Sequence, residues 1–259
     1  MKTRELLSKH GLSIASVLVF FSLWEAGSRL GVLPKDYIGT PSVFFVEFYK
    51  LFNQRTINTY LLPSVEALVT GLLIAIVLGT VFGFAIGVNA TVRKIFKPFL
   101  FAINTIPVVV FFPLFVFAFG ISLESVIIVI VAMCTVPILI NVVQGVASAD
   151  SLLLTMAKSF KAKKLLVVKE VLFYSTLPYL FAGIKAAIGR SVIALIIAEL
   201  YGLNRGIGYL IAFYGGSFHA DKLMALVLFI LLINCILFAI LWFIEKRFYK
   251  VGYRKETQI

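Results

Sequence analysis

The chain has 259 residues, of which 61% are hydrophobic and only 14% are charged. Soluble domains are about half apolar, so this composition excludes an ordinary soluble protein and indicates an integral membrane protein. The net charge of +12 is accounted for by basic segments on one side of a membrane and by anionic lipid. Binding to nucleic acid is therefore not needed to explain it.

Long apolar runs predict the number of membrane crossings. Two of these runs carry charges: the first holds Glu25 and Arg29, and the fifth holds Lys185 and Arg190. The runs are continuously apolar and do not alternate between apolar and polar residues with a period of two, which favours helices over a β-barrel. We therefore predict an all-α membrane protein, a single domain over 1–259. About 20 residues cross a bilayer as a helix, which places six transmembrane helices at about 11–31, 62–90, 98–119, 124–147, 174–200 and 222–245.

The distribution of basic residues predicts the orientation. If the N-terminus is cytoplasmic, most of the 24 Lys and Arg residues fall in the inside segments. The positive-inside rule then places both termini in the cytoplasm. The first apolar run lacks a small-residue cleavage site before Trp24, so we interpret it as an uncleaved span and not as a signal peptide.

Small residues recur every fourth position along the second expected span. They are Gly71, Ala75, Gly79, Gly83 and Gly87. This spacing places them on one helix face, where they let another helix approach closely. The alternative is that glycine is simply common in membrane helices.

Two segments are expected at the outer surface. In the first, Thr40 can cap a helix that starts at Pro41, and its Phe44, Phe45 and Phe48 lie along one side. That helix lies on the membrane surface or packs as an ordinary loop helix. The second segment, 201–219, is glycine-rich around an apolar centre, which predicts a partly re-entrant segment buried against protein.

The basic segment 150–183 lies between two apolar runs and contains five lysines. Its apolar residues, such as Met156, Ala157 and Phe160, recur with helical spacing. We predict a short amphipathic helix at about 151–166 that docks a partner. A solvated basic loop held at lipid headgroups is the alternative.

Charged residues of the fifth expected span are the candidates for the translocation path. Lys185 can reach the cytoplasmic face, but Arg190 lies nearer mid-membrane and needs a partner or a water-filled cavity. Arg190 either pairs structurally with a neighbouring helix or lines a path that favours an anion. Glu199 follows nine residues later, half a turn out of phase. We expect Glu199 to be exposed at the outer end.

The chain shows no pattern for catalysis or for a cofactor. It has no GxxxxGK[ST] phosphate loop. Its two cysteines and two histidines are too scattered for a metal site or a disulfide framework. A membrane-embedded enzyme is therefore disfavoured, and we predict no catalytic residue and no metal. A secondary transporter or channel remains the alternative function, although it would usually show inverted repeats and several intramembrane ionisable groups.

An ordered set of residues resembles the membrane-spanning permeases of bacterial ABC importers of the nitrate, taurine and alkanesulfonate type. The set comprises Trp24, Glu25, Pro41, Ser42, Ser64, Gly71, Gly79, Gly83, Gly87, Pro98, Ile106, Pro107, Pro113, Leu114, Phe119, Gly120, Pro137, Asn141, Gly145, Asp150, Ala157, Leu177, Pro178, Gly183, Glu199, Leu200, Gly206, Gly208 and Leu210. The cytoplasmic signature of this family is a Glu-Ala-Ala triplet followed four residues later by glycine. Here the triplet reads Thr155, Met156 and Ala157, and Lys161 stands in place of the glycine.

The resemblance implies a type I importer permease with a cytoplasmic coupling helix. Its coupling residues would be Thr155, Met156, Ala157, Phe160 and Lys161. Pro107, Arg190 and Glu199 are the candidates for the path. The implied assembly is a homodimer in the bacterial inner membrane, with two cytoplasmic ATPase subunits that hold ATP and Mg. An external binding protein would deliver a small solute, which in this family is nitrate, a sulfonate, bicarbonate or a pyrimidine-like vitamin precursor.

Overall fold

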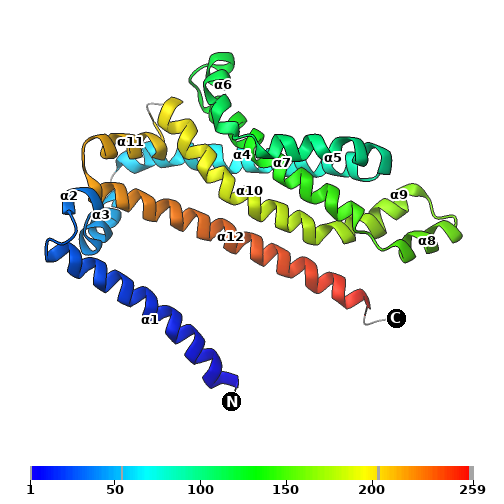
Figure 1. The fold of residues 1–259 in the computed structure, drawn as a ribbon, viewed down its shortest axis with the longest axis horizontal. Coiled ribbons are helices and arrows are strands. Elements are labelled where there is room, and N and C mark those ends of the chain that lie inside the picture. Colours follow the sequence, from blue (N-terminus) through cyan, green and yellow to red (C-terminus); the bar gives the residue numbers. More distant parts are fainter. Residues whose placement is uncertain (1, 54, 203–204, 257–259) are drawn as a thin grey trace.

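The computed structural model describes residues 2–53, 55–202 and 205–256. Within these ranges the secondary structure is helical and contains no strand. Figure 1 shows long helices running the length of the molecule, with short helices at both ends. Four described helical segments are long and apolar enough to cross a membrane: Tyr60–Gly87, Leu123–Ala147, Lys164–Tyr201 and Ala220–Phe248. The predicted all-α class is confirmed.

Helix α7 (Leu123–Ala147) forms the centre of the fold. It packs against α4 (Arg55–Gly87) and α10 (Phe173–Gly202) along most of its length. A helix that is apolar all round must be buried. Accordingly, Ile130 and Ile138 of α7 are fully buried.

Helices α12, α3 and α1 lie outside this centre. Helix α12 (Ala220–Glu256) contacts α10 and also α3 (Pro41–Asn53). Helix α1 (Lys2–Arg29) contacts α3 near its end and otherwise extends away from the other long helices (Figure 1). The expected span 11–31 lies along α1, in which residues 12–14 are among those whose side chains are not described. Exposed apolar side chains on α1, such as Leu18 and Leu23, are suited to contact with lipid.

The expected third span, 98–119, is not one helix, so that prediction is wrong. Helix α5 (Ala90–Thr105) is followed by a break, a short 3₁₀ helix over Val108–Phe111 and then α6 (Phe112–Phe119). Pro107 has no N–H to continue the helix, and it forces the preceding residue toward extended backbone. Ile106 indeed has φ −74° and ψ 124°.

The expected single helix at 151–166 is also divided. Helix α8 (Ser151–Ser159) is capped by Asp150, whose carboxylate accepts the Leu152 N–H at 2.8 Å. The chain then turns, and α9 (Lys164–Val167) continues through a π-helical turn into α10. Lys161, in the turn, has φ +50°, a left-handed conformation that cannot occur inside a right-handed helix.

The other expected spans lie inside longer helices. The segment 62–90 lies in α4 as far as Gly87, where this helix ends short of the expected boundary, and 124–147 falls in α7. The segments 174–200 and 222–245 fall within α10 and α12. The opposite end of the molecule from α8 and α9 carries two short helices, α2 (Lys35–Ile38) and α11 (Ile207–Gly216) (Figure 1).

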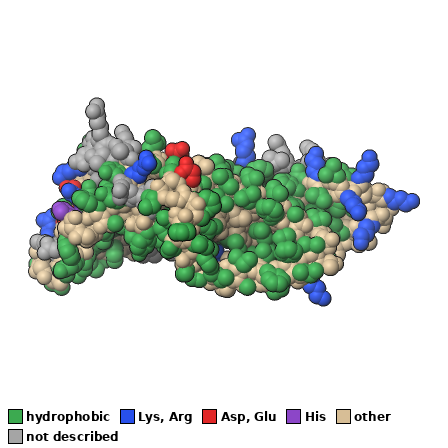
Figure 2. All heavy atoms as spheres, turned by 90° about the horizontal axis from the view of Figure 1, so that it is seen from above, with side chains coloured by type: hydrophobic (Ala, Val, Ile, Leu, Met, Phe, Trp, Pro, Cys, Tyr) green, Lys and Arg blue, Asp and Glu red, His purple; other side chains and the backbone are tan. Residues whose placement is uncertain are grey.

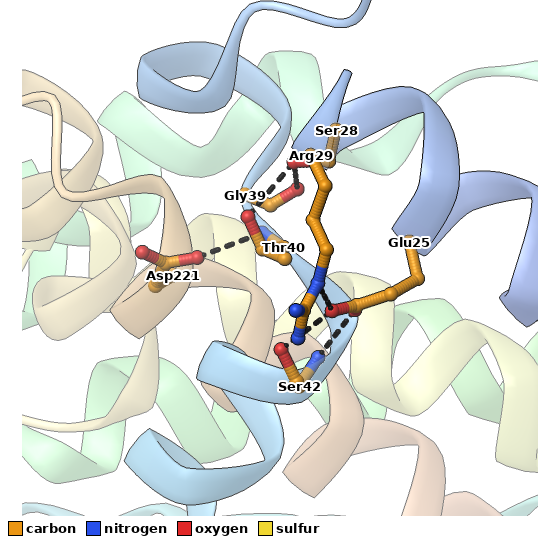
Figure 3. A network of polar contacts seen from close by, with 7 residues as sticks. All are labelled: Glu25, Ser28, Arg29, Gly39, Thr40, Ser42 and Asp221. Carbon is orange, nitrogen blue, oxygen red and sulfur yellow. Dashed lines mark hydrogen bonds and ion pairs between the residues drawn. The ribbon is translucent and has the colours of Figure 1, made fainter. Parts of the chain in front are cut away.

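Two carboxylates fasten the start of α3 at this end (Figure 3). Glu25 accepts the Ser42 N–H at 2.9 Å and the Arg29 Nε–H at 2.6 Å. Asp221 of α12 accepts the Thr40 N–H at 2.9 Å. The Thr40 hydroxyl, which we expected to cap α3, instead lies 2.8 Å from the Ser28 hydroxyl. Glu25 therefore satisfies the N–H that the cap residue usually takes.

Aromatic packing holds α3 against α1. Phe44 is buried, and its ring centroid lies 5.5 Å from that of Trp24. Phe45 on the neighbouring position is half exposed. The helix therefore packs on α12 and α1, and its place on the outer membrane surface stays a prediction.

Candidate translocation path and coupling segment

Arg190 lies beside the break that follows α5. Its Nη1–H donates to the Asn104 side-chain oxygen at 2.8 Å. Both residues line a cavity of 260 Å³, together with Pro107, Met133 and Ile193. Sequence reasoning had not singled out Asn104, because nothing in the sequence tells which helix faces α10 at this level.

The cavity offers hydrogen-bond donors to an anion. Arg190 is partly exposed, and no ion pair to it is present among the described residues. A guanidinium has five N–H donors, and its partner here is a neutral amide. Within the described residues, no carboxylate therefore offsets the Arg190 guanidinium, which can offer further N–H groups to a ligand.

Glu199, near the end of α10, is fully buried. Its carboxylate accepts hydrogen bonds from the Ser64 hydroxyl at 2.5 Å and from the Gly208 N–H at 2.8 Å. The Ser64 hydroxyl in turn accepts the Ile207 N–H at 2.9 Å. The expectation that Glu199 is exposed at the outer end is therefore wrong.

The burial of Glu199 follows from the way α11 folds back over α10. The first N–H groups of a helix have no partner within the helix, and the helix dipole favours a negative charge there. The Glu199 carboxyl group accepts one of these N–H groups, that of Gly208, at the start of α11. Gly206 has φ +102°, and a Cβ at Gly208 would lie 2.5 Å from the Ile196 carbonyl oxygen. Only glycine lets the chain approach the carboxylate this closely.

The three candidates for the path are thus not brought to one place. Pro107 and Arg190 line the same cavity. Glu199 is not among its lining residues and instead binds the start of α11. The re-entrant outer segment that the glycine-rich sequence predicted corresponds to α11, whose Ile207 and Leu210 are buried.

The other cation of α10 has a carboxylate partner. Lys185 Nζ lies 2.7 Å from a carboxylate oxygen of Glu245, on α12. Its side chain is 43% exposed. We expected Lys185 to extend to the cytoplasmic face; in the structure it forms an ion pair with a neighbouring helix.

The stripe of small residues on α4 faces α7. A Cβ at Gly71, Gly79, Gly83 or Gly87 would lie 2.6–2.8 Å from a side-chain carbon of α7. The opposing side chains follow the same four-residue spacing and are Ile130, Ile138, Val142 and Val146. Ala75, within the stripe, is fully buried. Branched side chains of one helix thus fill the groove left by the glycines of the other.

The candidate coupling residues of α8 lie on two different faces of the helix. Met156 and Phe160 are exposed, and Leu152, which sequence reasoning missed, continues their four-residue spacing on the same face. Ala157 and Lys161 instead line a cleft between α8 and the ends of α4 and α7. The Thr155 hydroxyl donates to the Ser151 carbonyl at 2.8 Å, inside α8.

With this arrangement established, the sequence was compared with known proteins. The family model described as "Binding-protein-dependent transport system inner membrane component" matches residues 48–250. The chain belongs to this family. It is a multi-pass permease subunit of an ABC importer and not an enzyme.

Curated relatives of the permease cover most of its length. The taurine transport system permease protein TauC of Escherichia coli is 25% identical over 83% of the permease and 80% of the relative. The nitrate import permease protein NrtB of Leptolyngbya laminosa is 31% identical over 71% and 66%. The bicarbonate transport system permease protein CmpB of Synechococcus elongatus is 27% identical over 87% and 85%.

Proposed function

We propose that the permease imports a small anion and that Arg190 lies on the path of this anion. Nitrate and bicarbonate, named for two relatives, are anions, and taurine carries an anionic sulfonate. A cation inside a membrane domain is costly unless it has a function or a partner. The single observation that carries the proposal is the Arg190 guanidinium on a neutral amide, in a cavity at a helix break.

The helix break supports this location for the path. Non-helical backbone at membrane depth is tolerated where it is buried in protein or lines a water-filled cavity. Transporters commonly build their solute sites at such breaks. The break at Pro107 adjoins the cavity that Arg190 lines. Glu199, away from this cavity, fastens α11 to α10 and shapes the outer end of the path.

Helix α8 docks a cytoplasmic ATPase in this proposal. Leu152, Met156 and Phe160 present an exposed apolar stripe. An amphipathic helix of this kind fits a groove on a partner. A short turn joins α8 to α9, and α9 continues through a π-helical turn into α10, so a push on α8 is passed through α9 to α10 and with it to Arg190.

The assembly follows the family. Two copies of the permease form a homodimer in the bacterial inner membrane, with two ATPase subunits that bind ATP and Mg and with an external binding protein. Helix α1 and the α5–α6 segment complete six spans, and both termini are cytoplasmic. The end of α12 at Glu256 and helix α8 lie toward the same end of the molecule (Figure 1), which agrees with this orientation. A secondary transporter is the alternative, and ATP dependence distinguishes the two.

The test uses Arg190→Gln in vesicles that contain the complete transporter and binding protein. We expect uptake of the labelled anion to be lost while basal ATP hydrolysis and folding stay normal, because glutamine keeps the hydrogen bonding but removes the charge. Arg190→Lys, which keeps the charge, retains part of the uptake. Unchanged uptake by Arg190→Gln would eliminate the path role.

A further inference from the structure

Two adjoining clefts open where α4 and α7 end. The first, of 360 Å³, lies between α5 and α7. The second, of 720 Å³, lies between these helix ends and the α8–α9 segment. Ala90, Arg93 and Ala147 line both clefts. Since α4 ends at Gly87 and α7 at Ala147, the clefts lie at the level where the chain leaves the membrane.

Basic side chains surround these clefts. The first cleft is lined by Arg93, Lys94 and Lys97, and the second adds Lys158, Lys161 and Lys164. No carboxylate lines either cleft within the described ranges. Figure 2 shows Lys and Arg side chains gathered at the end of the molecule where α8 and α9 lie, whereas the visible acidic side chains lie away from this end.

The deeper wall of the first cleft is apolar. Leu100 and Phe101 of α5 line it together with Ile140 and Val143 of α7. Leu100 follows Ala90 by ten residues, which is about 15 Å along the helix. The cleft therefore changes from basic to apolar with depth, as the headgroup and acyl layers of a lipid leaflet do.

Arg93 is held in place at the wall shared by the clefts. Its Nη1–H donates to the Gly87 carbonyl oxygen at 2.7 Å, which is one of the carbonyls left without a helical partner at the end of α4. The remaining N–H groups of the guanidinium suit a phosphate, which arginine can bind through two parallel hydrogen bonds.

We propose that the first cleft binds an anionic phospholipid. Arg93, Lys94 and Lys97 hold its phosphate, and an acyl chain lies over Leu100 and Phe101. Basic pockets between transmembrane helices at the membrane surface are suited to such headgroups. An acidic segment of a soluble partner could match the charges, but it could not follow the apolar wall into the hydrocarbon layer.

The second cleft indicates a headgroup with two phosphates. It is continuous with the first through Arg93 and has three further lysines. A diphosphatidylglycerol headgroup would place one phosphate in each cleft, whereas phosphatidylglycerol would occupy the first cleft alone. Both lipids satisfy the proposal, and diphosphatidylglycerol is expected to be retained more strongly.

The experiment measures lipid retained by the permease purified together with its ATPase. The complex is equilibrated with mixed vesicles of diphosphatidylglycerol, phosphatidylglycerol and phosphatidylcholine, and bound lipid is counted by native mass spectrometry. Lys94→Gln/Lys97→Gln is compared with Lys169→Gln/Arg247→Gln, which removes the same charge outside the clefts. We expect the first variant to retain the anionic lipids about 30-fold less well, and the second to retain them nearly normally.

Several results would overturn the proposal. One is an equal loss of anionic lipid in both variants, and another is that the unaltered permease retains phosphatidylcholine as well as the anionic lipids. Displacement of the bound lipid by millimolar inorganic phosphate, or its loss when the ATPase binds, would also contradict the site. The main variant leaves Arg93 and its bond to Gly87 intact. If it fails to fold, Lys94→Gln and Lys97→Gln are tested singly, and retention unchanged in both would equally contradict the site.

Discussion

The packing of α4 on α7 makes a quantitative prediction at Gly83. A Cβ there would lie 2.6 Å from Val142 Cβ and 3.2 Å from the Leu139 carbonyl oxygen. Real Cβ atoms do not approach that closely, so Gly83→Ala forces the two helices apart. Overpacking of this kind costs about 1–3 kcal/mol. For a protein of this size the loss corresponds to a fall in Tm of roughly 2–10 °C.

A double-mutant cycle isolates this contact. Val142→Ala alone removes two buried methyl groups and costs about 1–2 kcal/mol. Combined with Gly83→Ala, it removes one of the two closest contacts, the one of 2.7 Å to Val142 Cγ1, so the double variant is more stable than the sum of the two single effects. Thermal unfolding in detergent measures all four proteins. Leu73→Phe, at a position that is 58% exposed, is the control and should leave Tm nearly unchanged.

The reasoning fails if Gly83→Ala and Leu73→Phe unfold at the same temperature. It fails equally if the effects of Gly83→Ala and Val142→Ala add without coupling. Either result would mean that the stripe of small residues does not hold α4 against α7.

Two further predictions concern α8 and the turn that follows it. Phe160, whose side chain is 79% exposed, is expected to anchor the ATPase. Phe160→Asp should weaken binding of the ATPase by at least ~2 kcal/mol, measured by copurification, without affecting membrane insertion. Normal transport with the ATPase bound would contradict this. Lys161→Gly should stabilise the permease by about 1 kcal/mol because glycine adopts the left-handed conformation freely, whereas Lys158→Gly, inside α8, should destabilise it by a similar amount. Equal Tm values for the two glycine variants would refute the argument.

The sequence predicted those features that depend on one helix at a time. Long apolar runs identified α4, α7, α10 and α12, because burial in lipid or protein requires the same apolar character along a whole helix. The four-residue spacing of small residues identified the packing face of α4, and the structure shows that the helix against it is α7. The glycine-rich segment after α10 indicated a segment buried against protein, and Ile207 and Leu210 of α11 are buried.

Features that depend on two distant segments could not be predicted in the same way. Glu199 is buried because Ser64 and the start of α11 supply its hydrogen bonds. Lys185 finds Glu245 and Arg190 finds Asn104 on other helices. The spacing of residues within one helix cannot predict which residue of another helix will be the partner.

The break after α5 was missed for a different reason. The run 98–123 is continuously apolar, and hydropathy cannot distinguish one helix from two. The presence of Pro107 was the available signal, since proline ends a helix at the preceding residue. The left-handed conformation of Lys161 could also have been predicted, because the family has glycine at that position.

The central claim is that this permease imports a small anion with energy from a partner ATPase. The most direct measurement is uptake of labelled nitrate, bicarbonate and taurine into vesicles reconstituted with the permease, its ATPase and its binding protein. The account predicts uptake of one of these solutes that requires ATP hydrolysis and all three proteins. Uptake that proceeds without ATP, driven by the solute's own gradient or by an ion gradient, would contradict the account and identify a secondary transporter or channel.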